Sequence, residues 1–368
     1  MDYREATSIK IDGIYFGKDD LLSFSKAQIK NIEIAGWQKS ICNFILIWLD
    51  NSDHIIVKTS GSTGAPKSIK LKKQYMLNSA LKTGAFLGLK KNDSALLCLS
   101  ADYIAGKMMV VRSMVLGLDL MMLEPSGNPL KNMDKKLDFV AMVPMQVFQV
   151  FQEDDGTEKL NRIKNLIIGG APVPIYLKEK IKSLTNNTFS TYGMTETITH
   201  IAMERLNGKK ADGKLYPLPG IKISTDDQKR LIIYAPDISD RVVKTNDLAE
   251  ISEDGSFKIL GRFDNMIITG GINIIPETVE KKIEKFIDQR YIISAIYDEK
   301  LGEKLILIIE GDEWLPEKIK ALQQEMAENL HPYENPRQIF FISKFPETAS
   351  QKIDRGGVVE RWSGGVAE

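Results

Sequence analysis

The chain has 368 residues, of which 43% are hydrophobic and 27% are charged. These values are ordinary for globular proteins and exclude a collagen, a coiled coil or a disordered chain as a description of the whole. The length fits two or three domains. There are 49 basic residues (lysine and arginine) and 49 acidic residues (aspartate and glutamate), so the formal net charge is zero. The chain therefore lacks the basic excess typical of nucleic-acid-binding proteins.

The sequence contains two cysteines, Cys42 and Cys98, and three histidines. Their spacing is not that of a zinc site, and two isolated cysteines favour a reducing compartment over a disulfide scaffold. The first residues lack the apolar core of a secretory signal. The apolar stretch 41–49 is too short to span a membrane, and charges interrupt the stretch 108–123. We expect a soluble, cytoplasmic protein with no membrane span.

Up to about residue 210, short apolar runs alternate with amphipathic segments. Strands are predicted at 55–57, 94–99, 139–143 and 165–168, and helices at 74–87 and 146–152. Buried strands that alternate with helices pair in parallel at the centre of a sheet. The pattern therefore predicts a large α/β domain with mostly parallel sheets flanked by helices.

The pattern changes after residue 210. Short strands separated by turn signals indicate a small antiparallel sheet; they lie at 221–224, 230–234, 249–252 and 257–260. Further helices and strands are predicted at 276–287, 291–297, 305–309, 316–330 and 338–342. We expect two domains, a large one over 1–263 and a small C-terminal α/β domain over 264–368.

The segment Lys58–Lys67 (KTSGSTGAPK) follows a predicted strand and is dense in glycine, serine and threonine. Glycines let the backbone approach an anion, and amides and hydroxyls donate hydrogen bonds to phosphate oxygens. The segment is not a Walker A loop, because Gly61 and Gly64 are followed by Pro66-Lys67 rather than by the required Gly-Lys pair. A phosphate-binding loop is a better interpretation than an ordinary surface turn.

Three further segments carry functional groups. Ser190–Thr197 (STYGMTET) combines an aromatic ring, hydroxyls and a carboxylate, which suit a purine, a phosphate and Mg²⁺. Alone, it equally fits a strand end with a buried glutamate. The third segment comprises Lys244–Leu248 (KTNDL) and Gly261–Asn265 (GRFDN), and the fourth is Thr348–Arg355 (TASQKIDR). The late lysine of the fourth segment would by itself be interpreted as solvent-exposed.

The order and combination of these four segments resemble the adenylate-forming superfamily of acyl-CoA synthetases, peptide-synthetase adenylation domains and luciferases. The resemblance runs from Lys58 to Ile353, which is most of the chain. It implies an AMP-forming acid–CoA ligase that uses ATP, Mg²⁺ and CoA. A carboxylate attacks the α-phosphorus of ATP to form an acyl-adenylate and pyrophosphate, and a thiol then displaces AMP.

By this resemblance, Lys352, Thr195 and Glu196 are the catalytic residues, and Glu196 is also the Mg²⁺ ligand. Asp264 is the hinge on which the small domain rotates, so that domain is expected to be mobile. The nucleotide-binding residues implied are Thr59, Ser60, Gly61, Ser62, Thr63, Gly64, Lys67, Gly169, Gly170, Ala171, Pro172, Tyr192, Gly193, Asp247 and Arg262. Within this set, Tyr192 stacks on the adenine and Asp247 accepts hydrogen bonds from the ribose.

The chain is short for this superfamily, since only 57 residues precede the phosphate loop. In this it is similar to the o-succinylbenzoate–CoA ligases of menaquinone biosynthesis, our first hypothesis for its function. Tyr103 stands where the family usually has an acyl-pocket histidine. A dicarboxylate substrate requires a second cation, for which Lys107 and Arg112 are candidates; on a helix surface they would have no such role.

Three alternatives stay open: another aryl- or acyl-CoA ligase, an adenylation enzyme that loads a carrier protein, and a non-enzymatic nucleotide-binding module. Acid specificity and the identity of the thiol acceptor distinguish the first two from our hypothesis. The expected partners are a carboxylic acid, ATP and CoA, and no nucleic acid. The sequence leaves the oligomeric state, including a homodimer, open.

Overall fold

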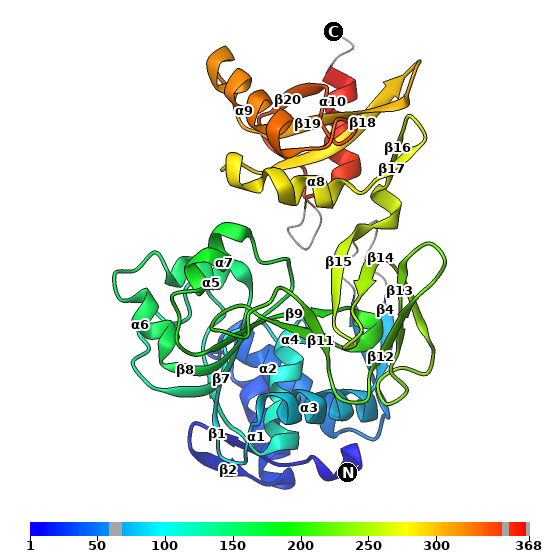
Figure 1. The fold of residues 1–368 in the computed structure, drawn as a ribbon. Coiled ribbons are helices and arrows are strands. Elements are labelled where there is room, and N and C mark those ends of the chain that lie inside the picture. The colour runs from blue at the N-terminus through cyan, green and yellow to red at the C-terminus, as the bar shows by residue number, and fades with distance from the viewer. Residues whose placement is uncertain (59–67, 348–352, 366–368) are drawn as a thin grey trace.

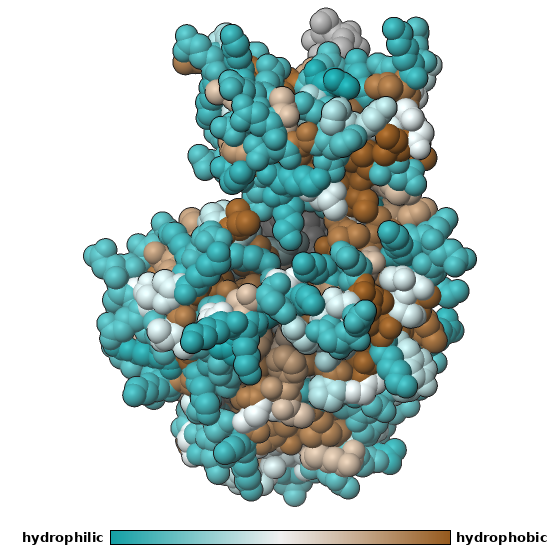
Figure 2. All heavy atoms as spheres, viewed as in Figure 1, coloured by the Kyte–Doolittle hydropathy of each residue, from teal (hydrophilic) through white to brown (hydrophobic). Residues whose placement is uncertain are grey.

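The computed structural model describes residues 1–58, 68–347 and 353–365, and it forms two lobes with a constriction between them (Figures 1 and 2). The larger lobe is built on a 13-stranded mixed sheet and the C-terminal lobe on a separate five-stranded sheet. A pair of antiparallel strands, β3 (His54–Lys58) and β4 (Ser68–Lys72), completes the larger lobe. The predicted α/β fold class is confirmed.

One half of the large sheet is parallel. Its strands, in spatial order, are β9 (Asn187–Gly193), β8 (Ile163–Ile168), β7 (Leu137–Met142), β5 (Ser94–Leu97), β6 (Asp119–Met122) and β1 (Ile9–Ile11). Strand β2 (Ile14–Phe16) closes this end as an antiparallel hairpin with β1. The central strands are nearly continuous apolar runs because both of their faces are covered by helices.

The other half of the sheet is antiparallel. From β9 outward its strands are β10 (His200–Arg205), β11 (Leu215–Pro217), β15 (Phe257–Arg262), β14 (Val243–Ile251), β13 (Arg230–Tyr234) and β12 (Lys222–Thr225). Strand β9 therefore pairs in parallel with β8 and antiparallel with β10. The predicted antiparallel strands thus continue the parallel ones within one sheet.

Helices cover both faces of the parallel strands and bury two separate cores. The helices on one side are α1 (Lys18–Lys30), α2 (Gly36–Leu49), α3 (Lys73–Leu87) and α4 (Ile104–Leu116). The helices on the other are α5 (Pro144–Val150), α6 (Gly156–Asn161) and α7 (Ile175–Ile181). Within β5, Leu97 faces the first core and Leu96 the second, as the alternation of side chains along a strand requires.

The C-terminal lobe has its own sheet and cores. Its strands are β16 (Ile267–Thr269), β17 (Ile272–Ile274), β18 (Tyr291–Asp298), β19 (Gly302–Glu310) and β20 (Gln338–Ile342), and its helices are α8 (Pro276–Ile283), α9 (Pro316–Asn329) and α10 (Arg355–Gly365). The helix predicted to reach residue 287 ends at Ile283, and a 3₁₀ turn, η4 (Glu284–Phe286), follows it. In the described part of the chain, no helix is both long and apolar enough to cross a membrane.

The two lobes contact each other at two separate places. The linker is the 3₁₀ turn η3 (Phe263–Asn265) between β15 and β16. Beside it, the Glu277 carboxylate of α8 approaches Gly261 of β15 so closely that a Cβ on this glycine would lie 2.3 Å from Oε2. At the second place, the backbone N–H of Ile175 at the start of α7 donates to Glu284 Oε1 at 2.8 Å.

Gly106, inside α4, allows this helix to pack against the preceding loop. A Cβ at this position would lie 2.2 Å from the carbonyl oxygen of Ser100 and 2.5 Å from its carbon. We predict that Gly106→Ala lowers the free energy of unfolding by about 2 kcal/mol, because backbone has to shift against backbone. The exposed Gly36 of α2 meets no atom within 4 Å, so Gly36→Ala is the matched control. Urea denaturation should show that it is neutral or stabilising; equal effects of both changes would refute the packing argument.

Candidate active site

The carboxyl ends of β8 and β9 place two glycine-containing segments next to each other. Gly169–Pro172 follows β8, and Tyr192 and Gly193 end the adjacent parallel strand β9. Gly170 has φ +87°, a conformation that side chains disfavour, and a Cβ on Gly169 would lie 2.4 Å from Thr191 Oγ1. Ligands of open α/β sheets bind at this edge, outside the carboxyl ends of the strands.

Tyr192 connects this edge to the antiparallel half of the sheet. Its hydroxyl donates to Asp247 Oδ2 of β14 at 2.5 Å, and its ring meets that of Phe257 edge-on, with the centroids 5.8 Å apart. Burial and the Asp247 charge raise the pKa of the Tyr192 phenol, so it remains a donor at neutral pH. The hydrogen bond fixes the Tyr192 and Asp247 side chains relative to each other.

Asp247 also belongs to a charged cluster at the linker. It pairs across the strands with Arg262, and Arg262 Nη1 lies 3.5 Å from Asp247 Oδ1. The same guanidinium donates to Asp264 Oδ2 at 2.8 Å, and Asn246 Nδ2 donates to that oxygen at 3.0 Å. Partial burial acts to lower the pKa of Arg262, but its hydrogen bond to Asp264 and both aspartate charges outweigh this and raise it.

The turn between β9 and β10 carries Thr195 and Glu196 on a 3₁₀ turn, η2 (Thr195–Thr197), where Glu196 is exposed. Gly193 is required here, because a Cβ would lie 2.2 Å from Thr199 O. Thr197 holds the turn: its hydroxyl oxygen lies 3.1 Å from the Met194 N–H, 3.0 Å from Met194 O and 2.9 Å from Thr199 O. These bonds hold Ile198 at φ +66°, a strained conformation of the kind that clusters at functional sites.

Two predicted parts of the site lie outside the described residues. The first is the predicted phosphate-binding loop, with Thr59, Ser60, Gly61, Ser62, Thr63, Gly64 and Lys67, and the second is Lys352. The ends of the first are paired, since Lys58 of β3 faces Ser68 of β4. After the second, Ile353 forms a bridge with Glu347, and Arg355 Nη2 donates to Glu280 Oε2 at 2.5 Å. These contacts fix the neighbouring residues on either side.

The three acyl-pocket candidates have different surroundings. Tyr103 precedes α4 and is 65% exposed. The Lys107 ammonium is half-buried and donates to the carbonyls of Ala101 and Asp102 at 2.5 and 2.7 Å. Arg112 is only 2% exposed, burial lowers its pKa to about 10, and its Nε has no hydrogen-bond partner. Within the described residues, no carboxylate pairs with it.

His200, the first residue of β10, was not singled out from the sequence. Its cross-strand neighbour is Gly193, and it is 7% exposed. Burial and the nearby Arg112 charge keep the pKa of His200 well below its usual value. Position was the available signal, because His200 is one of three histidines in the chain and follows Glu196 by four residues.

The described residues contain no cluster of three or more histidine, cysteine or acidic side chains that would form a metal cage. Mg²⁺ in nucleotide sites is instead held by one or two carboxylates together with phosphates and water. The exposed carboxylate of Glu196 on η2 fits that kind of site.

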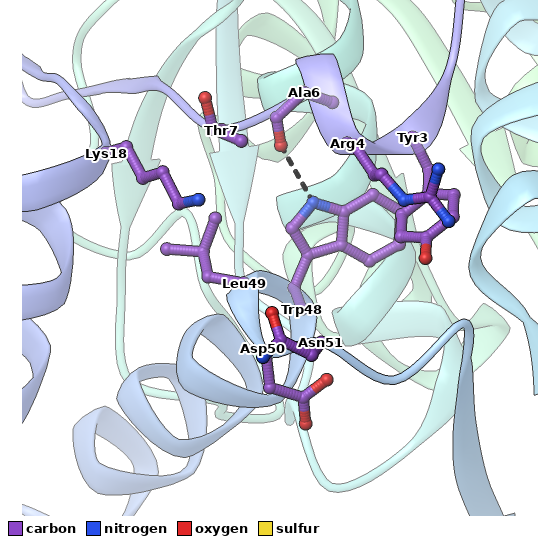
Figure 3. A pocket seen from close by; sticks show the side chains of 9 residues that line it. All are labelled: Tyr3, Arg4, Ala6, Thr7, Lys18, Trp48, Leu49, Asp50 and Asn51. Atoms are coloured by element: carbon purple, nitrogen blue, oxygen red, sulfur yellow. Dashed lines mark hydrogen bonds between the residues drawn. The ribbon is translucent and has the colours of Figure 1, made fainter.

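A cavity of about 150 Å³ lies beside the N-terminal segment and is lined by Tyr3, Arg4, Lys18, Trp48 and Asp50, among others (Figure 3). Trp48 Nε1 donates to Ala6 O at its wall, 2.9 Å away. None of the residues predicted to bind nucleotide or acid lines this cavity, so the candidate active site is at the strand ends and not here.

Comparison with known proteins agrees with this geometry. The model of the AMP-binding enzyme family matches residues 48–233. A 2-succinylbenzoate–CoA ligase of Listeria monocytogenes is 27% identical over 332 residues, covering 84% of this chain and 70% of that protein. An "acyl-CoA synthetase (AMP-forming)/AMP-acid ligase II-like protein" of Dyadobacter fermentans has a solved structure that is 34% identical, with a TM-score of 0.62, covering 92% of this chain and 97% of that one.

A second solved structure shows how far the fold is shared. It is the o-succinylbenzoate CoA synthetase of Bacillus subtilis in complex with the acyl-adenylate intermediate, with a TM-score of 0.75 and 16% identity. The match covers 96% of this chain and 95% of that one. The resemblance stated from the sequence is therefore confirmed: the chain belongs to the AMP-binding, adenylate-forming superfamily and is an enzyme of the AMP-forming acid–CoA ligase family.

Proposed function

We propose that this enzyme activates a dicarboxylic acid, with o-succinylbenzoate as the first candidate and menaquinone biosynthesis as the pathway. The observation that carries the proposal is Arg112, a buried guanidinium with no carboxylate partner among the described residues. An uncompensated buried charge costs several kcal/mol, which a bound anion would offset. The 2-succinylbenzoate–CoA ligases among its relatives act on an acid of this class.

The reaction has two steps. A carboxylate oxygen of the acid forms a bond to the α-phosphorus of ATP, and the bond between the α-phosphorus and the bridging oxygen to the β-phosphate breaks, releasing pyrophosphate. The sulfur of CoA then bonds to the acyl carbon, its proton is lost, and AMP leaves with the electrons of the acyl–oxygen bond. Both reactants of the first step are anions, so positioned cations and amides should dominate catalysis.

In this proposal, the nucleotide lies across the ends of β8 and β9. The adenine is lined by the segment after β8, which comprises Gly169, Gly170, Ala171 and Pro172, and the Tyr192 ring stacks on it. Asp247 accepts hydrogen bonds from the ribose hydroxyls, with Arg262 beside it. Support comes from the hydrogen bond between Tyr192 and Asp247 and the ion pair between Asp247 and Arg262, which hold these groups in place before ATP arrives.

The phosphates are assigned to the turn after β9 and the loop 59–67. Thr195 contacts the α-phosphate, Glu196 holds Mg²⁺, and the loop holds the β- and γ-phosphates. When bound, Mg²⁺ supplies positive charge at the phosphate oxygens. The narrow turn fixed by Gly193 and Thr197 supports this assignment, because it presents Thr195 and Glu196 at the same edge as Tyr192.

We further propose that residues 1–263 and 264–368 act as two domains that rotate about Asp264. Lys352 would then enter the site for adenylation and lie between the acid carboxylate and the α-phosphate. Separate hydrophobic cores in the two lobes and the short linker η3 support this division.

Lys107 and Tyr103 are weaker candidates than Arg112 for the acid pocket, because the Lys107 ammonium already binds two carbonyls and Tyr103 is exposed.

Lys352→Ala should separate the two steps. We predict a loss of about 10²–10³-fold in the rate of pyrophosphate release, because one preorganised cation is removed. The reaction of a preformed acyl-adenylate with CoA should be unchanged. Lys320→Ala, an exposed lysine on α9, is the control and should affect neither step. An equal loss in both steps, or in neither, would refute the role of Lys352.

The variant Arg112→Met tests whether Arg112 binds the second carboxylate of a dicarboxylate substrate. Charge-assisted hydrogen bonds are worth about 1.5–3 kcal/mol, so KM for o-succinylbenzoate should rise roughly 10–100-fold. KM for 3-benzoylpropionate, which lacks the ring carboxylate, should not change. Lys107→Met should affect both acids alike if its ammonium only holds the loop before α4. Steady-state assays of AMP release with CoA measure these constants, and equal changes with both acids in Arg112→Met would contradict the proposal.

A further inference from the structure

A second cavity lies in the C-terminal lobe, at a gap along one edge of β19. Strand β16 pairs with this edge at Gly302, and β20 pairs with it from Ile306 onward, while β18 fills the opposite edge. Between the two shorter strands, the Arg337 N–H donates to Leu305 O at 2.9 Å. A cavity of about 20 Å³ lies beside this stretch of β19, and we call it the β19 cavity.

The polar side chains around the β19 cavity have no partners within the described part of the chain. Five of them line it: Thr269, Lys304, Tyr333, Asn335 and Arg337. None of these five side chains makes a hydrogen bond or an ion pair with another described residue. Thr269 is only 3% exposed, and burying a hydroxyl without a hydrogen bond costs free energy. A ligand that accepts a hydrogen bond from Thr269 would offset this cost.

The charge at the β19 cavity is positive. Lys304 and Arg337 supply two cations, and no acidic side chain among the described residues lines the cavity. Two carboxylates lie nearby in the sequence and have other partners. Glu303 accepts the Ile268 N–H at 2.8 Å, and Asp298, whose pKa Lys304 helps to lower, accepts two N–H groups of the turn between β18 and β19. Two cations with a hydroxyl and an amide form a donor set that suits a phosphate group.

The size of the cavity limits which part of a ligand it can hold. A space of about 20 Å³ admits little more than one small polar group. A phosphate oxygen fits this space, and the rest of the ligand would lie outside, over the exposed Arg337 and Tyr333. The Tyr333 ring is 43% exposed and stacks on His331, so it offers an aromatic surface on which a purine can lie.

The proposed function supplies two phosphorylated substrates. The phosphates of ATP are assigned to the larger lobe, at the turn after β9 and the loop 59–67. CoA carries a 3′-phosphate and a diphosphate, for which the larger lobe has no assigned group.

We propose that the β19 cavity binds a phosphate group of CoA. Arg337 and Lys304 hold its negative charge, and the Thr269 hydroxyl donates to one of its oxygens. This inference rests on the proposed function in that CoA is the thiol substrate, and it does not depend on which acid is activated. Since CoA enters after the acyl-adenylate has formed, the site serves the second step and adenylation proceeds without it.

Arg337→Gln and Thr269→Val test the site, because they remove the charge and the hydroxyl with little change in size. KM for CoA should rise about tenfold in Arg337→Gln and about threefold in Thr269→Val. The rate of pyrophosphate release and kcat at saturating CoA should not change. KM for pantetheine, which has the thiol but no phosphate, should not change either. Arg361→Gln, an exposed arginine of α10 that does not line the cavity, is the matched control and should keep the wild-type constants.

Dephospho-CoA, which lacks the 3′-phosphate, identifies the phosphate that binds. If the cavity binds the 3′-phosphate, wild type should have a raised KM for dephospho-CoA that Arg337→Gln raises no further. If it binds the diphosphate, Arg337→Gln should raise KM for both compounds alike. Either result supports the site.

Isothermal titration with CoA measures binding in the absence of any acid, so it separates this site from the proposed substrate class. If wild type activates no dicarboxylate but Arg337→Gln still weakens CoA binding, the substrate class is overturned and the site stands. If Arg337→Gln and wild type bind CoA equally well, or if wild type binds no CoA, the site is overturned. If only inorganic phosphate loses affinity in Arg337→Gln, the cavity binds a free anion and the assignment to CoA is overturned.

Discussion

The site depends on the position of β9, which pairs in parallel with β8 on one side and antiparallel with β10 on the other. Parallel pairing brings the glycines after β8 to the same edge as Tyr192. The antiparallel strands return the chain so that Asp247 of β14 reaches the Tyr192 hydroxyl. A single change of pairing direction thus gathers segments from three distant parts of the sequence. It also creates the narrow turn after β9, where there is no room for a side chain at Gly193 and the Thr197 hydroxyl hydrogen-bonds the backbone.

The parts that the sequence could predict are those whose physical signal is local. Central strands such as β7 and β8 are continuous apolar runs, and the functional segments were found because several motifs occur in a fixed order. Strand β14 was predicted only from residue 249, although it begins at Val243, because its first half is polar where it borders the site. The surroundings of His200 could not be predicted. The Thr83 hydroxyl that hydrogen-bonds its ring belongs to α3, 117 residues earlier in the sequence, and only the packing of this helix against the sheet brings the two together.

The environment of Arg112 differs from those of the other buried cations. Lys73 is fully buried and donates to Asp50, and Lys159 is buried against Glu153 and Asp155. In both cases the chain supplies its own counter-charge, so these lysines have a structural explanation. Arg112 has none among the described residues, where its neighbours include the Met109 sulfur and the Phe139 ring. A buried charge without a counter-charge costs stability, and it is the feature on which the proposed carboxylate-binding role of Arg112 rests.

The carboxylate of Glu284 has a consequence for the two lobes. It accepts the Ile175 N–H at the start of α7, one of the amides that a helix leaves unsatisfied within itself. Any swing of the C-terminal lobe must break this link, yet water can solvate both the amide and the carboxylate as they separate. This hydrogen bond therefore favours the arrangement of the lobes seen here, and breaking it in the proposed rotation about Asp264 would cost little free energy.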